Sequence, residues 1–259
     1  MSDAKPRILI FDIETAPVLS YVWRLFDENI GLNQIVSDWF VLSWAAKWAD
    51  GDKVMYRDQR KAERIEDDST LMKEIWGLLD QADIVVTQNG KRFDAKKLNA
   101  RFVMLGMQPP SSYRHIDTYQ IAKKHFAFTS NKLEYMTDKL CTKYKKLAHK
   151  EFPGFELWRE CLKGNKKAWR EMERYNRHDV LSLEELWEKL RPWDSSINFD
   201  VYHEHNYNHC KCGADDWKKY GYAFTNTGKF QRLQCKKCGA ETRCKENLLS
   251  KIKRLSLTK

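Results

Sequence analysis

An apolar run that ends in two acids lies close to the N-terminus. Residues 8–14 read ILIFDIE, so a stretch suited to a buried strand finishes with Asp12 and Glu14. Side chains two residues apart on a strand point to the same face, and these two acids therefore project together. A buried charge is costly unless something compensates it. A single acid would fit a helix cap or a salt bridge, but a pair on one face of a core strand needs another explanation.

The rest of the chain predicts an α/β domain followed by a small second unit. Hydrophobic residues make up 42% of the 259 positions, which is enough for one sizeable core. Strands are expected at 7–13, 40–48, 54–57 and 83–87, and helices at 69–80, 93–105, 117–125, 131–141, 155–162 and 165–190. This order implies an α/β domain over residues 1–195. A polar, aromatic linker then leads to a cysteine-rich unit over residues 205–259.

Positive charge is concentrated at the C-terminal end. Residues 209–259 carry 13 Lys and Arg against four Asp and Glu, whereas residues 1–208 carry 33 against 32. Such an asymmetry indicates a polyanionic partner, nucleic acid first, although a solvated tail would also have it. The chain has no apolar stretch of transmembrane length and no signal-peptide core after Met1. We therefore expect a cytoplasmic protein with no membrane association.

Further acids stand where they could join the first pair. Asp94 lies near the start of a predicted helix, where by itself it would be an ordinary first-turn acid. Tyr175 and Asp179 are i and i+4 on one helical face. Crowded carboxylates repel one another and would protonate unless cations lay among them. Oxygen ligands of this kind suit Mg²⁺ or Mn²⁺, and two such ions can activate a water and stabilise the leaving oxygen of a phosphodiester.

Three short motifs occur in a fixed order. They are FDIET at 11–15, NGKRFD at 89–94, and a tyrosine, Tyr175, four residues before Asp179. Together they resemble the motifs of the DEDD-type 3′→5′ exonucleases of the RNase H-like superfamily. The tyrosine branch, which includes the proofreading domains of family B DNA polymerases, is the most similar. The resemblance covers residues 7–191 and implies an RNase H-like mixed sheet flanked by helices.

The resemblance also implies an activity and a set of site residues. Asp12, Glu14, Asp94 and Asp179 would hold two Mg²⁺ or Mn²⁺ ions, and Tyr175 would orient the attacking water. The implied reaction is 3′→5′ hydrolysis of single-stranded DNA, with replication or repair proteins as further partners. An RNA-directed or structure-specific nuclease stays open, because both sugars are compatible with the same metal chemistry. A nucleic-acid-binding adaptor that does not cut stays open as well.

Several residues near the motifs have more than one interpretation. The histidine branch of the family has a His where this chain has Arg174, so His178 is expected to contact backbone instead of the attacking water. Asp117 opens a predicted helix and is expected to be its N-cap, in preference to a fifth metal ligand. Asn89 is a candidate nucleic-acid contact, but it could equally satisfy its own loop. Phe93 is expected to belong to the core, with base stacking as the alternative role for an aromatic residue near the site.

Five of the seven cysteines lie between residues 210 and 244. In a chain without a secretion signal this clustering favours metal over disulfides. The stretches HCKCG at 209–213 and CKKCG at 235–239 resemble the two knuckles of a zinc ribbon. The expected ligands of one structural Zn²⁺ are Cys210, Cys212, Cys235 and Cys238. His209 is an alternative to Cys210, because the spacing favours the histidine while ligand softness favours the cysteine. Cys244 is a weaker candidate.

Aromatic and basic residues alternate between the two knuckles. Tyr220, Tyr222 and Phe224 lie on one face of a predicted strand that leads into a hairpin turn at 226–228. Bases could stack on these rings while Lys229 and Arg232 contact phosphates. The same aromatic residues could instead form the small core of the ribbon.

Overall fold

The computed structural model describes residues 5–145, 151–202 and 209–258. Two compact units divide the chain: Pro6–Trp187, which we call the larger unit, and the chain from Glu188 onward, which we call the C-terminal unit. The division falls inside α6 (Lys166–Leu190). The expected domain bounds, 1–195 and 205–259, stay predictions.

Strand β1 (Ile8–Thr15) is the central strand of a five-stranded sheet in the larger unit, with the order β5–β4–β1–β6–β7. Its neighbours are β4 (Val41–Trp48), β5 (Met55–Asp58), β6 (Ile84–Thr87) and β7 (Arg114–Asp117). Strands β6 and β7 run parallel to β1, whereas β4 is antiparallel to it and β5 is antiparallel to β4. The sheet is therefore mixed. Leu9, Ile10 and Phe11 at its centre are fully buried.

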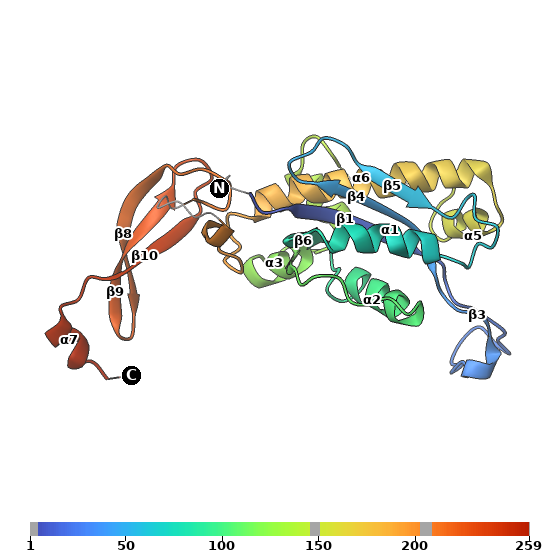
Figure 1. The fold of residues 1–259 in the computed structure, drawn as a ribbon, viewed down its shortest axis with the longest axis horizontal. Helices are drawn as coiled ribbons and strands as arrows, with labels where there is room; N and C mark the ends of the chain where they lie inside the picture. Colours follow the sequence, from blue (N-terminus) through green and yellow to red (C-terminus); the bar gives the residue numbers. More distant parts are fainter. Residues whose placement is uncertain (1–4, 146–150, 203–208, 259) are drawn as a thin grey trace. The chain divides into compact units, whose positions relative to one another are not determined.

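Helices flank this sheet (Figure 1). They are α1 (Ser69–Leu79), α2 (Asp94–Met104), α3 (Thr118–His125), α4 (Leu133–Leu140), α5 (Glu156–Leu162) and α6. Leu9, Phe11 and Ile13 of β1 pack with apolar side chains of α1 and α2 in one core cluster. A second cluster joins Leu42 of β4 and Ala16 to α5 and α6. The mixed sheet flanked by helices that was expected from the sequence is confirmed.

The alternation of side chains along β1 decides what the two acids face. Phe11 and Ile13 belong to the cluster with α1 and α2. Asp12 and Glu14 therefore project from the opposite face, and contacts with α5 and α6 place them on the side of those helices. The apolar half of the strand fixes it in the core. That packing holds the acidic end in a constant place.

The expected helices and strands begin and end within two residues of the observed ones, but some strands were not foreseen. Strand β7 was not expected from the sequence, because its four residues, RHID, carry little apolar signal and pair with β6 only through the tertiary fold. Helix α1 starts at the expected residue. Asp68 is at its N-cap position and makes no side-chain capping bond there. Its carboxylate instead pairs with Arg101 of α2.

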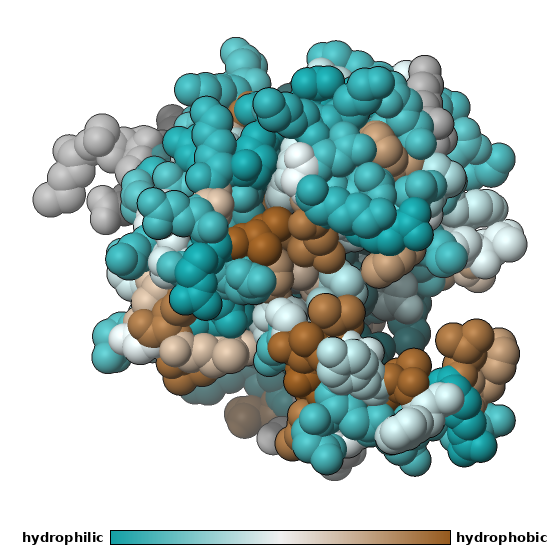
Figure 2. Space-filling view, turned by 90° about the vertical axis from the view of Figure 1, so that its right-hand side faces the viewer, coloured by the Kyte–Doolittle hydropathy of each residue, from teal (hydrophilic) through white to brown (hydrophobic). Residues whose placement is uncertain are grey.

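A short hairpin between β1 and β4 was not foreseen either. It consists of β2 (Leu19–Ser20), the 3₁₀ turn η1 (Leu32–Gln34) and β3 (Ile35–Ser37). Many of its large apolar side chains are exposed: Val18, Leu19, Tyr21, Val22, Trp23, Leu25, Phe26, Ile30, Leu32 and Val36. Figure 2 looks onto the end of the larger unit where this hairpin lies, and apolar residues gather on the surface in view.

The C-terminal unit contains a three-stranded antiparallel sheet in the order β10–β9–β8. Its elements are η2 (Phe199–Tyr202), β8 (Trp217–Thr225), β9 (Gly228–Cys235), β10 (Glu241–Asn247) and α7 (Lys251–Leu255). The predicted hairpin at 226–228 is confirmed as the turn between β8 and β9. The buried cluster of the sheet consists of Cys210, Cys235 and Ala240, so cysteines supply most of its small core.

Candidate functional site

The acids of β1 are held by neutral hydrogen-bond donors from helices distant in the sequence. Asn176 Nδ2 of α6 donates to Asp12 Oδ2 at 2.7 Å, and Ser43 Oγ of β4 donates to Asn176 Oδ1 at 3.1 Å. Trp158 Nε1 of α5 donates to Glu14 Oε2 at 3.2 Å. These donors orient both carboxylates without neutralising them. The two acids thus keep their capacity to bind a cation.

Asp94 joins the same strand end from the first turn of α2. Its Oδ1 accepts a hydrogen bond from the backbone N–H of Ile13 at 3.2 Å, and its side chain is buried. Burial raises the pKa of Asp94 to about 7; the Ile13 N–H opposes this shift, and the charge of Asp117 adds to it. A carboxyl group so raised loses its proton readily once a cation lies beside it. Asp94 is therefore well suited to bind a metal ion.

Tyr175 and Asp179 enter from α6, one helical turn apart. The Tyr175 side chain hydrogen-bonds with that of Asp179. The pKa of Tyr175 is raised far above its usual value, first by burial and then by the negative charges of Asp179, Glu14 and Asp12. The hydroxyl consequently keeps its proton at neutral pH and can donate a hydrogen bond. Asn176, the next residue of α6, is hydrogen-bonded to Asp12, so residues from β1 and α6 come together here.

The candidate carboxylates do not form a tight group of metal-binding atoms. Among the described residues, only one group of three or more His, Cys, Asp or Glu has all its ligand atoms within 4.8 Å of one another, and that group consists of cysteines. Carboxylates that repel one another are expected to stand further apart. The roles of Asp12, Glu14, Asp94 and Asp179 as metal ligands and of Tyr175 as the water-orienting residue stay predictions.

Asp117 fixes the loop that carries the second motif. Its carboxylate accepts the backbone N–H of Tyr119 at 3.0 Å, which confirms it as the N-cap of α3. It also accepts the N–H groups of Asn89 at 2.8 Å and Lys91 at 3.2 Å. Three backbone donors thus occupy this acid. Its link to the 89–91 loop was missed by sequence reasoning, because the two segments meet only through the pairing of β6 with β7.

Three other residues lie near the motifs: Asn89, His178 and Phe93. Asn89 has a φ of +61°, a left-handed conformation that asparagine tolerates, and its contact with nucleic acid stays a prediction. The ring of His178 hydrogen-bonds to the backbone carbonyl of Lys145, as expected for a residue that does not orient the water. Phe93 was expected in the core, and this was wrong: its side chain is 40% exposed. It precedes α2 and is not part of the cluster that buries Leu98.

The cysteine cluster of the C-terminal unit consists of Cys210, Cys212, Cys235 and Cys238. Cys210 Sγ lies 3.5 Å from Cys238 Sγ, and Cys212 Sγ lies 3.7 Å from Cys235 Sγ. A disulfide would need about 2.05 Å. Tetrahedral Zn²⁺ with Zn–S bonds of about 2.3 Å separates its sulfur ligands by about 3.75 Å. The four thiols thus have the spacing of a structural zinc site.

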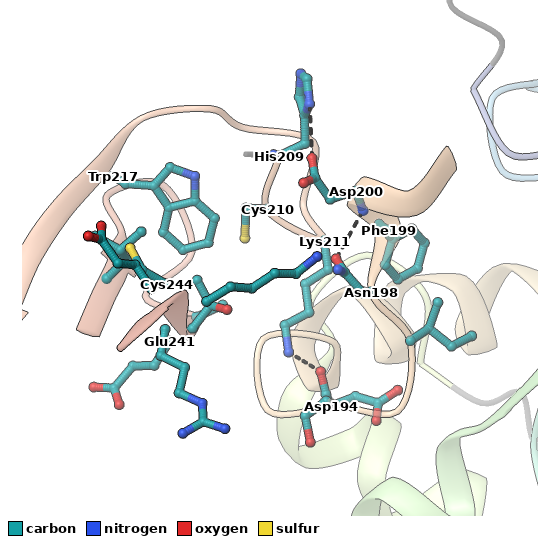
Figure 3. Close-up of a pocket in the computed structure, with 18 residues that line it drawn as sticks. Asp194, Asn198, Phe199, Asp200, His209, Cys210, Lys211, Trp217, Glu241 and Cys244 are labelled. Carbon is teal, nitrogen blue, oxygen red and sulfur yellow. Dashed lines mark hydrogen bonds and ion pairs between the residues drawn. The ribbon is translucent and has the colours of Figure 1, made fainter. Parts of the chain in front are cut away.

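Cys210, and not His209, belongs to the cluster. Gly213 and Gly239 have φ values of +82° and +76°, which allow the chain to turn tightly behind each cysteine pair. His209 instead lies beside Asp200, with Nδ1 3.6 Å from Oδ1. Cys244 is also outside the cluster. It lines a neighbouring cavity of about 520 Å³, shown in Figure 3, into which the Lys211 amine also reaches to contact the Asp194 carbonyl.

The β8–β9 hairpin presents exposed aromatic rings with cations beside them. The common face expected for the three rings was wrong, because a register shift between Lys219 and Tyr222 turns Tyr220 to the opposite face from Tyr222 and Phe224. Tyr220, Tyr222 and Phe224 are 45%, 46% and 71% exposed, so they do not form the core of the ribbon. Lys229 Nζ lies 3.9 Å from the Tyr222 ring centroid, and the Arg232 guanidinium lies 4.7 Å from that of Tyr220. Rings and cations in this arrangement can take bases and phosphates of a single strand. The roles of Lys229 and Arg232 as nucleic-acid contacts stay predictions.

Comparisons with known proteins agree with the architecture of the larger unit. A family model of the RNase H superfamily matches residues 9–191. A solved structure of the family B DNA polymerase from the hyperthermophilic archaeon Pyrobaculum calidifontis is similar, with a TM-score of 0.54 and 18% sequence identity. The similarity covers 73% of this chain but 25% of the polymerase chain, and at this identity it shows the fold alone. No curated protein matches the sequence.

None of the described helices has both the length and the apolar character needed to cross a membrane.

Proposed function

Because the chain belongs to the RNase H superfamily, we propose that it is a divalent-metal-dependent 3′→5′ exonuclease acting on single-stranded DNA. The observation that carries this proposal is the meeting of Asp12 and Glu14 from β1, Asp94 from α2, and Tyr175 and Asp179 from α6. They are the residues that match the DEDD motifs of the tyrosine branch.

The donor set fits divalent metal. All four candidate ligands are carboxylates, which Mg²⁺ and Mn²⁺ prefer, and they come from rigid elements of the core. Burial raises the pKa of Asp94, a cost that a neighbouring cation would remove. Asp12, Glu14, Asp94 and Asp179 would hold two ions. When bound, these ions would supply water activation and stabilisation of the leaving oxygen.

In this proposal the side chains around the acids orient the carboxylates and the attacking water. Asn176 and Trp158 hold the carboxylates of Asp12 and Glu14 in constant orientations. Tyr175 keeps its proton because of burial and the surrounding negative charge, and donates it in a hydrogen bond to Asp179, which fixes the direction of the hydroxyl group. The oxygen of that hydroxyl would then accept a hydrogen bond from the attacking water and orient it.

The C-terminal unit would hold the strand. We assign one structural Zn²⁺ to the four-cysteine cluster, because a unit with so little apolar core needs a bound metal to stabilise its fold. The exposed rings of the β8–β9 hairpin with Lys229 and Arg232 would bind bases and backbone. Replication or repair proteins are the partners that such an activity would serve.

The test uses clean protein and end-labelled oligonucleotides. With Mg²⁺ or Mn²⁺ we expect stepwise shortening of 5′-labelled single-stranded DNA from its 3′ end, and loss of this ladder in Asp12→Ala and Asp179→Ala. Asp52→Ala, an exposed acid, is the matched control and should cut like the wild type. Retained stepwise degradation in Asp12→Ala would refute the assignment. Parallel assays with RNA and duplex DNA decide the substrate, and tight binding without any cleavage would favour an adaptor.

A further inference from the structure

A half-buried lysine lies beside the carboxylate site and has no acid bound to it. Lys97 follows Asp94 by three residues on α2. Its Nζ is 3.5 Å from the centroid of the Trp39 ring and 5.8 Å from that of Phe93. Across residues 5–145, 151–202 and 209–258, no hydrogen bond or ion pair engages this ammonium group. Its three N–H donors are thus available to a ligand.

The tertiary structure fixes Trp39 next to the acidic end of β1. The backbone N–H of Ala16, two residues after Glu14, donates to the carbonyl of Phe40 at 2.8 Å, and Phe40 is buried. Trp39 immediately precedes this anchor. The ring and the lysine therefore join two segments that carry candidate ligands: Trp39 adjoins the chain that follows Glu14, and Lys97 belongs to the helix that begins at Asp94.

The surroundings of Lys97 favour an incoming anion. Burial lowers the pKa of Lys97, and the nearby charge of Asp38 counteracts this shift only in part. Asp38 itself accepts the Trp39 backbone N–H at 2.7 Å. An ammonium group that has lost part of its hydration, and that few negative charges offset, is stabilised when an anion binds to it. Arg101, one turn further along α2, is instead committed to the buried carboxylate of Asp68.

We propose that Lys97, held in place by the Trp39 ring, binds a backbone phosphate of the nucleic-acid strand next to the carboxylate site. The proposal rests on the proposed function, since it takes the same strand as its ligand. A cluster of four acids repels a polyanion, and a cation adjacent to the cluster offsets that repulsion. Trp39 is a positioning residue: it directs the ammonium group, which would otherwise move freely on its four-carbon stem.

The test compares two neighbouring lysines. Lys96 is exposed on another face of α2, so Lys96→Met removes the same charge without touching the subsite. Binding of a fluorescent oligothymidylate is measured by anisotropy over a series of salt concentrations, with Ca²⁺ in place of Mg²⁺ to prevent turnover. In Lys97→Met we expect about tenfold weaker binding and a slope of log K against log salt that is shallower by about 0.7, the value for one phosphate contact on a single strand. Lys96→Met should retain the wild-type slope.

Two further variants separate phosphate binding from a structural role. Lys97→Arg should restore the salt slope, because it keeps the charge. Trp39→Leu keeps an apolar side chain but no ring face, and should weaken binding with an intermediate slope. Equal slopes and equal affinities for Lys97→Met and Lys96→Met would overturn the proposal, as would a wild type that binds no oligonucleotide. A changed slope in Lys97→Met together with retained cleavage in Asp12→Ala would leave this subsite standing and remove the proposed catalytic site.

Discussion

Gly90→Ala tests how the loop of the second motif positions Asp94. A Cβ at residue 90 would lie 2.3 Å from Thr87 Oγ1, 2.5 Å from Thr87 Cβ and 2.9 Å from Thr87 Cγ2. Thr87 is fully buried at the end of β6, and its hydroxyl is hydrogen-bonded to the His115 ring at 2.8 Å. The threonine cannot rotate away without losing that bond. The loop must move instead.

The structure gives the size of the effect. Ordinary contact begins near 3.4 Å, so the loop must shift by about 1 Å from a starting contact of 2.3 Å. A shift of that size stretches the bond from the Asn89 N–H to Asp117, now 2.8 Å, beyond hydrogen-bond range. Overpacking costs about 1–3 kcal/mol, and an unsatisfied buried N–H costs a similar amount. Alanine reduces the conformational freedom of the unfolded chain, which offsets up to about 1 kcal/mol, so we expect a net destabilisation of about 1–6 kcal/mol.

The assay pairs thermal unfolding with nuclease activity. For a unit of this size 1 kcal/mol corresponds to roughly 2–4 °C, so Gly90→Ala should lower the Tm by about 2–24 °C. Because Asp94 begins the helix that follows the loop, cleavage should fall by about 100-fold, the usual effect of a 1 Å misplacement. Gly77→Ala is the control: it lies in α1 with no atom near the new Cβ, and should raise stability slightly. A Gly90→Ala protein with unchanged Tm would refute the reasoning.

Three further outcomes are expected. Cys212→Ser should remove the hydrogen-exchange protection of β8 and β9 and leave the larger unit folded; persistent protection there would contradict a structural metal. Arg101→Met should lower the unfolding free energy in urea by about 3–5 kcal/mol, because the fully buried Asp68 loses its cation; a loss below about 1 kcal/mol would argue against this. Burial, with Lys91 adding to it, lowers the pKa of His115 to about 4, so the unfolded chain binds more protons between pH 6.5 and 4. Stability should therefore decrease over that interval as the pH falls, by up to about 3 kcal/mol, and His115→Gln should flatten the urea midpoints measured between pH 7 and 4.

The carboxylate pair on β1 and its common direction could be predicted because both depend on local structure. Apolar residues that alternate with acids determine which way each side chain points relative to its own strand. The same is true of Tyr175 and Asp179, whose spacing is one turn of a helix. The cysteine knuckles are equally local, since each ends in a glycine that can adopt the positive φ of a tight turn.

The hydrogen-bond partners of these residues could not be predicted from local sequence patterns. Asn176, which orients Asp12, is 164 positions away from it, and Trp158 is 144 positions away from Glu14. Asp117 binds the 89–91 loop only because β7 lies beside β6. Strand β7 itself is too short and too polar to be recognised before its neighbour is known.

Sequence by itself thus determined the chemistry that each element offers: paired acids on β1, a tyrosine one turn before an acid on α6, and thiols at two tight turns. Tertiary structure alone decided which of these groups meet and how they are charged. It selected Cys210 over His209 and raised the pKa of Asp94 through burial. It also placed the ammonium of Lys97 against the ring of Trp39. The physical reason is that side-chain direction follows from backbone periodicity, whereas burial and hydrogen-bond partners depend on long-range packing.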